Sequence, residues 1–201
     1  TRHAAAELRA NHDPRGAHYD DALGAWVAPF IMGPINTRVV RRSAALNALY
    51  GEPYAPRFAY QEYTKFGPPL AAAKATAMAA SMQGFAAAMA LRPARALLGA
   101  VLPKPGEGPS EQTMARGWFR TTLVGRTDDG RSARARIAYR GDPGNRATLR
   151  ILCESGLALA FDGDKLPGAP GRGGVLTPAT ALGAALVPRL RAAGFEISVG
   201  E

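Results

Sequence analysis

The sequence is poor in cysteine and in aromatic residues, and the latter make up 7% of its 201 residues. Cys153 is the only cysteine, so no internal disulfide can form and nothing indicates an oxidising compartment. Its apolar neighbours predict a buried structural thiol; they are Ile151, Leu152, Leu157 and Leu159. Much of the hydrophobic fraction of 47% is alanine, so we expect a lean, helix-rich core.

The sequence also lacks the short motifs of several enzyme classes. It contains no G-x-G-x-x-G dinucleotide fingerprint, Walker loop, HExxH pair, G-x-S-x-G elbow or CxxC pair. The glycine-rich segment Gly171–Gly174 lacks that spacing and is predicted to be a flexible loop before a helix, with a phosphate at the helix start as the alternative. The histidines, His3, His12 and His18, lack helical ligand spacing, so no metal is expected. No catalytic residue is assigned.

One stretch, Ala75–Leu91, has no charged residue. It is shorter than the roughly 20 strongly apolar residues of a membrane-spanning helix, so a buried or interface helix is predicted. Four of its side chains recur at helical spacing and are candidates for a hydrophobic pocket: Met78, Met82, Phe85 and Met89. The alternative is a helix that contacts an acyl chain or a membrane surface. No signal peptide is visible, so a cytoplasmic location is expected, with membrane association as the alternative. The missing initiator methionine is compatible with processing or truncation.

Positive charge exceeds negative charge over the whole chain. There are 25 Lys and Arg against 16 Asp and Glu, which gives a formal net charge of +9. Such a balance suits nucleic acid, an acidic membrane surface or an anionic ligand. Because the arginines are scattered from Arg2 to Arg191, no nucleic-acid partner is expected.

Turn and helix signals divide the chain into an N-terminal helix tail and linker, residues 1–25, and one domain, residues 26–201. Residues 13–21 are predicted as loop. Four helices are predicted. The first begins at Pro34, and the second spans Leu70–Leu102 with a break at Pro93. The third spans Asn145–Phe161, and the last follows Thr177 and is kinked at Pro188. Predicted strands are Phe58–Phe66, Trp118–Arg126, Ser132–Arg140 and Phe195–Val199. These elements predict an α+β fold, with a largely antiparallel or mixed sheet of about four to five strands and helices packed on one face.

The clearest structural signal is a hairpin around Asp128-Asp129-Gly130. Its second strand alternates between charged and apolar residues. One face carries Arg134, Arg136 and Arg140, and the other carries Ala133, Ala135, Ile137 and Tyr139. The first face is therefore predicted to be solvated or bound to something anionic, and the second to be packed.

Two segments supply candidate contacts to a substrate or cofactor. After Pro34, a helix start would offer free N–H groups to an anion beside Asn36, Thr37, Arg38 and Arg41. A helix cap with a solvated basic face explains these residues equally well. Of the same helix, Ile35, Val39, Ala45 and Leu46 are predicted to face the core. The second segment is the Pro/Gly loop with Lys104 and Glu107, which is either a rigid connector or a lid.

Several stretches, in this order, resemble one family. They are Trp26–Ser43 (WVAPFIMGPINTRVVRRS), Leu102–Glu111 (LPKPGEGPSE), Gly117–Phe119 (GWF), Gly173–Ala179 (GGVLTPA) and Leu190–Phe195 (LRAAGF). The chain from Trp26 onward is similar to the portion after the nucleotide-binding half of saccharopine-dehydrogenase-like oxidoreductases. That family includes the trans-acting enoyl reductases of lipid biosynthesis. Pro188, inside the last predicted helix, departs from the family pattern.

The resemblance implies an upstream Rossmann domain that binds NAD(P), while this chain shapes the substrate pocket and the oligomer interface. On that hypothesis the chain alone is inactive and binds no cofactor, its partners are the Rossmann domain and a small or lipid-like substrate, and the protein is a homodimer. One alternative is a lipid- or membrane-surface-binding module without catalysis. Another is a basic nucleic-acid binder, whose binding would weaken steeply with salt.

Overall fold

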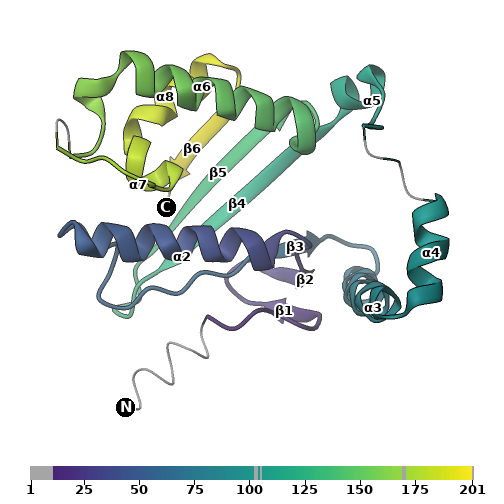
Figure 1. Ribbon diagram of the computed structural model, residues 1–201. Coiled ribbons are helices and arrows are strands. Elements are labelled where there is room, and N and C mark those ends of the chain that lie inside the picture. The colour runs from purple at the N-terminus through teal and green to yellow at the C-terminus, as the bar shows by residue number, and fades with distance from the viewer. Residues whose placement is uncertain (1–10, 102–103, 105, 169–170, 201) are drawn as a thin grey trace. The chain divides into compact units, whose positions relative to one another are not determined.

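The computed structural model describes residues 11–101, 104, 106–168 and 171–200. These residues form helices and two antiparallel sheets of three strands each, so the predicted α+β class is confirmed (Figure 1). The strands are divided between two sheets, where the sequence predicted one sheet of about four to five. The chain separates into two compact units, residues 1–107 and residues 108–201.

The first unit is built on a small meander. Its strands are β1 (His18–Asp20), β2 (Ala25–Pro29) and β3 (Tyr63–Phe66), paired in the order β1-β2-β3. The turn between β1 and β2 is closed by the Leu23 N–H, which donates to Asp20 Oδ1 at 2.8 Å. The prediction of an unbroken loop over residues 13–21 is therefore wrong, since β1 lies within it. A strand of three residues is too short to show an alternating pattern in the sequence. The predicted strand over residues 58–66 is formed only from Tyr63 onward.

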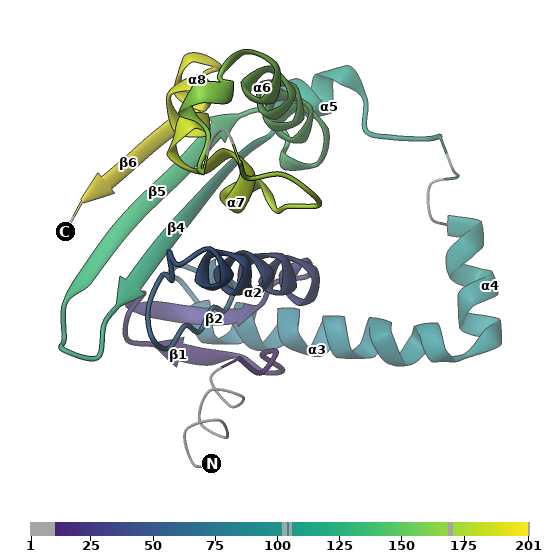
Figure 2. The ribbon, with the colours of Figure 1, turned by 60° about the vertical axis from the view of Figure 1, so that its left-hand side comes forward.

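Helix α3 (Ala71–Ala90) packs on this sheet through small side chains. Ala75 and Ala79 are buried against Ala28 of β2, and the methyl groups allow helix and strand to approach closely. Beyond this contact, α3 extends past the strands and is followed by α4 (Arg92–Val101) (Figure 2). The predicted break near Pro93 is confirmed, since the chain turns extended at Leu91 and Pro93 falls in the first turn of α4.

Helix α2 (Gly33–Leu49) begins where Pro34 predicted, but it is rotated from the predicted orientation. Of the four residues predicted to face the core only Leu46 is buried, whereas Ile35, Val39 and Ala45 are exposed. The buried face instead carries Gly33, Thr37, Ser43, Leu46 and Asn47. Threonine and serine are accepted there because each hydroxyl donates to the carbonyl four residues earlier, at 2.7 Å for Thr37 and 3.0 Å for Ser43. Hydrophobicity alone could not reveal that face.

The second unit is built on a sheet of β4 (Trp118–Arg126), β5 (Ser132–Arg140) and β6 (Glu196–Gly200), in the order β4-β5-β6. The predicted hairpin is confirmed: Thr127 N donates to Arg131 O at 3.0 Å, and Gly130 takes a φ of 86°. Phe195, which leads into β6, is buried and stacks on Tyr139 with ring centroids 4.3 Å apart.

The other elements of this unit are short helical segments. They are α5 (Glu111–Arg116), the π-helix η1 (Pro143–Ala147), α6 (Thr148–Phe161), the 3-10 helix η2 (Gly163–Lys165), α7 (Pro178–Leu182), the 3-10 helix η3 (Gly183–Ala185) and α8 (Leu186–Ala192). The last predicted helix is broken, but the break lies at Gly183, whose φ is 51°. Pro188 lies in the first turn of α8, where its missing N–H costs no helical hydrogen bond.

Cys153 on α6 is exposed, so the prediction of a buried thiol is wrong. The helix buries Ala158 completely. A residue five positions away lies about 140° around a helix of 3.6 residues per turn, so Cys153 points outward. The exposed face of α6 also carries Leu149, Leu152 and Leu159.

Two features, a membrane-spanning helix and a metal site, are absent from the described residues. No helix there combines the length and the apolar character needed to cross a membrane. No group of three or more histidine, cysteine or acidic side chains there is arranged to hold a metal ion.

Candidate functional site

The candidate site surrounds the start of α2, directly after β2. The backbone N–H of Gly33 donates to Phe30 O at 2.9 Å, and those of Ile35 and Asn36 donate to Met32 O at 3.0 and 2.9 Å. Pro34 has no N–H. The expectation of free N–H groups at this helix start is therefore wrong, and an anion would have to be held by side chains.

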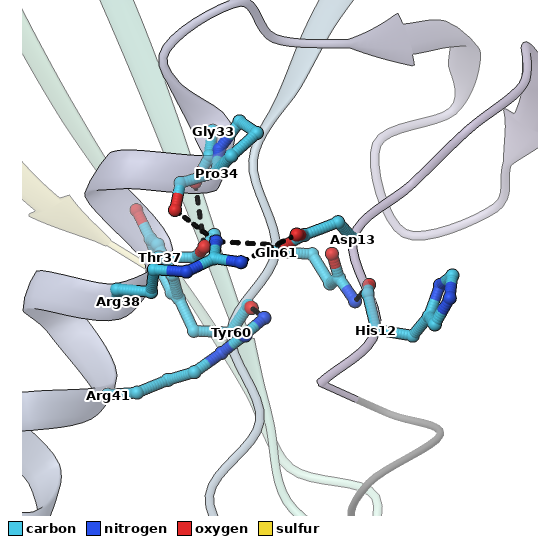
Figure 3. A network of polar contacts seen from close by, with 9 residues as sticks. All are labelled: His12, Asp13, Gly33, Pro34, Thr37, Arg38, Arg41, Tyr60 and Gln61. Atoms are coloured by element: carbon cyan, nitrogen blue, oxygen red, sulfur yellow. Dashed lines mark hydrogen bonds and ion pairs between the residues drawn. The ribbon is translucent and has the colours of Figure 1, made fainter.

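Arg38 is the most accessible of these side chains. Its Nη2 lies 3.1 Å from Asp13 Oδ2, its Nη1 donates to Pro34 O, and 62% of the side chain is exposed (Figure 3). Arg38 thereby connects α2 to the segment before β1. Exposed ion pairs of this kind are weak, so the guanidinium can exchange Asp13 for an anionic ligand at little cost.

Arg41, one turn further along α2, lies against residues 58–62. Its Nη2 donates to Tyr60 O at 2.9 Å (Figure 3). Among the residues that the structure describes, Arg41 Nε is buried and has no acceptor. The side-chain amide of Asn11 holds the backbone of the same segment. Its Nδ2 donates to Phe58 O at 3.2 Å, and its Oδ1 accepts from Tyr60 N at 3.3 Å.

Glu62 joins two neighbours through its two carboxylate oxygens. Asn36 Nδ2 donates to Oε2 at 2.9 Å, and the Tyr60 hydroxyl donates to Oε1 at 2.9 Å. Burial, and then the hydrogen bond to Glu62, raise the pKa of the Tyr60 phenol well above its usual value. A raised pKa makes a phenol a weaker acid, so Tyr60 is suited to orienting Glu62 rather than to giving up a proton.

The other candidates lie apart from this network. Thr37 is buried and bonded to its own helix, which gives it a structural contact. Lys104 and Glu107 form one turn: Lys104 N donates to Glu107 Oε2 and Glu107 N to Lys104 O, both at 2.9 Å. That turn lies where the two units meet in sequence. No described hydrogen bond or ion pair joins it to α2.

The four pocket candidates on α3 form a stripe beside its buried face. Met78, Phe85 and Met89 are exposed and Met82 is half-buried. Among the described parts of the chain, the stripe is therefore an open apolar surface and not an enclosed pocket wall.

The glycine-rich segment Gly171–Gly174 has no helix or strand, as the prediction of a loop before a helix requires. The helix that follows, α7, has only five residues, which gives little support to the alternative of a phosphate at its start.

The sequence indicated Asn36, Arg38 and Arg41 as candidates, but not the acidic residues that contact two of them, Glu62 at Asn36 and Asp13 at Arg38. Asp13 lies in a polar stretch that was treated only as loop. Glu62 was placed on a strand face, whereas residues 58–62 have no regular secondary structure. No periodic pattern in the sequence marks Asp13 or Glu62, because the residues that they contact, Arg38 and Asn36, are about 25 positions away along the chain.

Comparison with known proteins adds what this geometry leaves open. A protein named putative trans-acting enoyl reductase, from Mycobacterium tuberculosis strain H37Rv, is 43% identical over 181 residues, which cover 88% of this chain and 42% of that relative. Proteins named trans-acting enoyl reductase are 41% identical over 178 residues in Mycobacterium bovis BCG and 39% identical over 182 residues in Mycobacterium ulcerans. These matches cover 87% and 89% of this chain, and 41% and 42% of the relatives.

The chain is a homologue of proteins named trans-acting enoyl reductase. It spans less than half the length of the curated relatives that it matches. No family model and no solved structure matches it.

Proposed function

We propose that this chain forms the substrate-binding and assembly part of an NAD(P)-dependent, saccharopine-dehydrogenase-like enoyl reductase. The identity of 43% over 88% of the chain carries the proposal, because homologues at that level share their fold and usually their role. Such an enzyme transfers a hydride from NAD(P)H to the β-carbon of an enoyl double bond, and a proton is added at the α-carbon.

The dinucleotide site belongs, on this proposal, to the portion of the relatives outside the match. The chain has no glycine fingerprint, and all its described strand pairs are antiparallel, whereas a Rossmann site needs a parallel βαβ unit. The chain then contributes the surfaces that hold the acyl substrate. The apolar stripe on α3 suits an acyl chain, because methionine side chains adapt to flexible apolar ligands.

The polar cluster at the start of α2 is proposed to contact the head of the substrate or the cofactor. Arg38 and Arg41 supply donors, and Glu62 and Asp13 set the positions of the groups around them. The leucines exposed on α6 offer apolar surface for contact with the rest of the enzyme. We place the enzyme in the cytoplasm as a homodimer.

Binding of a substrate analogue tests the proposal. The full chain is titrated, by calorimetry, with a long-chain trans-2-enoyl thioester of N-acetylcysteamine and separately with NADPH. We expect the thioester to bind and NADPH not to bind. The double variant Met78→Ser and Phe85→Ser should weaken thioester binding by about tenfold, because two apolar contacts are lost. The double variant Leu152→Ser and Leu159→Ser, which removes two exposed apolar side chains of α6, is the matched control and should change affinity less than about twofold. NADPH binding to the chain, or equal effects of the two changes, would refute the proposal.

A lipid-surface module is the second candidate, favoured by the same exposed stripe on α3. It predicts that the chain sediments with vesicles of phosphatidylglycerol and that Met78→Ser with Phe85→Ser abolishes the effect. Thioester binding without vesicle binding decides for the reductase.

A further inference from the structure

The two faces of the β4–β5–β6 sheet differ completely in charge. The strand register places Trp118 opposite Arg140, Thr122 opposite Arg136, and Arg136 opposite Ser198. Residues with even numbers therefore share one face and those with odd numbers share the other. The odd-numbered face of the three strands has no charged side chain, and Phe119 and Tyr139 on it pack against Phe195.

The even-numbered face is basic and exposed. We call it the arginine face; its arginines are Arg120, Arg126, Arg134, Arg136 and Arg140, and all five are exposed. Among the residues of this face that the structure describes, the one acidic side chain is Glu196, which lies 3.8 Å from Arg136. Among the described residues, no carboxylate pairs with Arg120, Arg126 or Arg140. The face thus carries an excess of four positive charges in a region of three strands.

Such a concentration of like charge does not help the sheet to fold. No two of these arginines lie directly opposite each other in the register, but Arg120 lies diagonally across from Arg136 and Arg140, and Arg126 lies diagonally across from Arg134. Diagonal neighbours are about 7–8 Å apart, which is within a Debye length. Like charges at these separations repel. The repulsion is relieved when an anionic partner lies across the face.

Trp118 indicates what kind of partner fits. Its side chain is 67% exposed, and the Arg120 guanidinium lies 5.9 Å from its ring centroid. Tryptophan and arginine are the residue types that most often dominate binding energy at protein interfaces. Arginine also forms bidentate hydrogen bonds with carboxylates. Single-stranded nucleic acid, in contrast, is bound by a series of aromatic rings on which successive bases stack, and this face has one ring.

We propose that the arginine face, together with Trp118, docks an acidic protein surface. The partner presents carboxylates to Arg120, Arg126 and Arg140 and covers the Trp118 ring. The docking site does not depend on the enoyl reductase assignment, because it rests only on the charge and register of this sheet.

Fluorescence anisotropy with labelled poly-L-glutamate tests the proposal on the full chain. The face variant carries Arg120→Gln, Arg126→Gln and Arg140→Gln. The control variant carries Arg42→Gln, Arg95→Gln and Arg150→Gln, which are exposed arginines outside the sheet and give the same change in net charge. We expect the face variant to bind at least about tenfold more weakly, because it loses three charge-assisted contacts, and the control to bind within twofold of the unmodified chain.

A second measurement separates a protein partner from nucleic acid. A single-stranded DNA of matched charge should bind more weakly than poly-L-glutamate, and Trp118→Ala should weaken poly-L-glutamate binding with circular dichroism unchanged. The proposal is overturned if the unmodified chain does not bind poly-L-glutamate, or if both triple variants lose affinity equally. It is also overturned if DNA binds more tightly and is lost in the face variant.

Discussion

The guanidinium of Arg189 on α8 donates to the carboxylate of Glu154 on α6, with Nη1 3.1 Å from Oε2. Its Nε donates to Asp162, the residue at which α6 ends. About three quarters of each partner's side chain in the Arg189–Glu154 pair is shielded from solvent, with 24% and 20% exposed. One side chain thus fixes α8 against both the middle and the end of α6.

Replacing Arg189 should loosen this pair of helices. Arg189→Gln removes the charge that Glu154 and Asp162 share, so we expect the melting temperature to fall by roughly 3–6 °C. Arg150→Gln, an exposed arginine on α6, is the control and should shift it by less than 1 °C or so. Differential scanning calorimetry measures both. Equal melting temperatures for the two variants would show that the bridge does not stabilise the fold.

The same cluster predicts a pH dependence. Hydrogen bonds from Lys165, at 2.8 Å, and from Arg189 lower the pKa of Asp162 below its usual value. Because the folded pKa is below the unfolded one, near 4, the carboxylate stabilises the fold above that pH. This stabilisation is lost as the pH falls through the folded pKa. Asp162→Asn should therefore show a shallower fall of melting temperature between about pH 5 and pH 3 than the unmodified chain. Parallel curves would contradict the prediction.

Val27 tests the packing of the first unit. It is fully buried in β2, with no exposed surface, whereas Val175 is 97% exposed. Val27→Ala leaves a cavity and should lower the free energy of unfolding by about 1–3 kcal/mol, while Val175→Ala should change it by less than about 0.5 kcal/mol. Urea denaturation followed by circular dichroism, which senses both units, measures the two changes. A loss for Val175→Ala as large as that for Val27→Ala would contradict the structure.

Gly117 tests the junction between α5 and the second sheet. A Cβ there would lie 2.7 Å from the backbone of Asp142, and Gly141 N donates to Gly117 O at 2.7 Å. Gly117→Ala must displace that backbone and should cost about 1–3 kcal/mol of unfolding free energy. A Cβ at Gly125, on β4, meets no atom within 4 Å, so Gly125→Ala should be close to neutral. A neutral Gly117→Ala would show that the two segments do not approach so closely.

The hairpin and the α+β class were predictable because they depend on local signals. Asp128-Asp129-Gly130 fits a turn in which Gly130 needs a positive φ, and the second of the two nine-residue strands beside it alternates between charged and apolar residues. The helix starting near Pro34 was predictable for a similar local reason. The arginine face was predicted in part, since the alternation along β5 placed Arg134, Arg136 and Arg140 on one face of the strand.

The errors came from contacts between residues distant in sequence. The buried face of α2 is set by what packs against it and by hydroxyl groups that bond to their own helix, so hydrophobicity placed Ile35 and Val39 wrongly. The split into two sheets depends on pairings that no local pattern encodes. Likewise, Asp13 and Glu62 became visible as partners of Arg38 and Asn36 only in three dimensions.

The central claim is that this chain supplies the substrate-binding part of an enoyl reductase. The most direct test exchanges the matched 181 residues of the Mycobacterium tuberculosis relative for this chain and follows NADPH absorbance with a trans-2-enoyl thioester. The unmodified relative and a variant without the exchanged segment are the controls. We predict that the chimera oxidises NADPH only when the thioester is present and that the deletion variant does not. A folded chimera that leaves NADPH unchanged, beside an active parent, would contradict the claim.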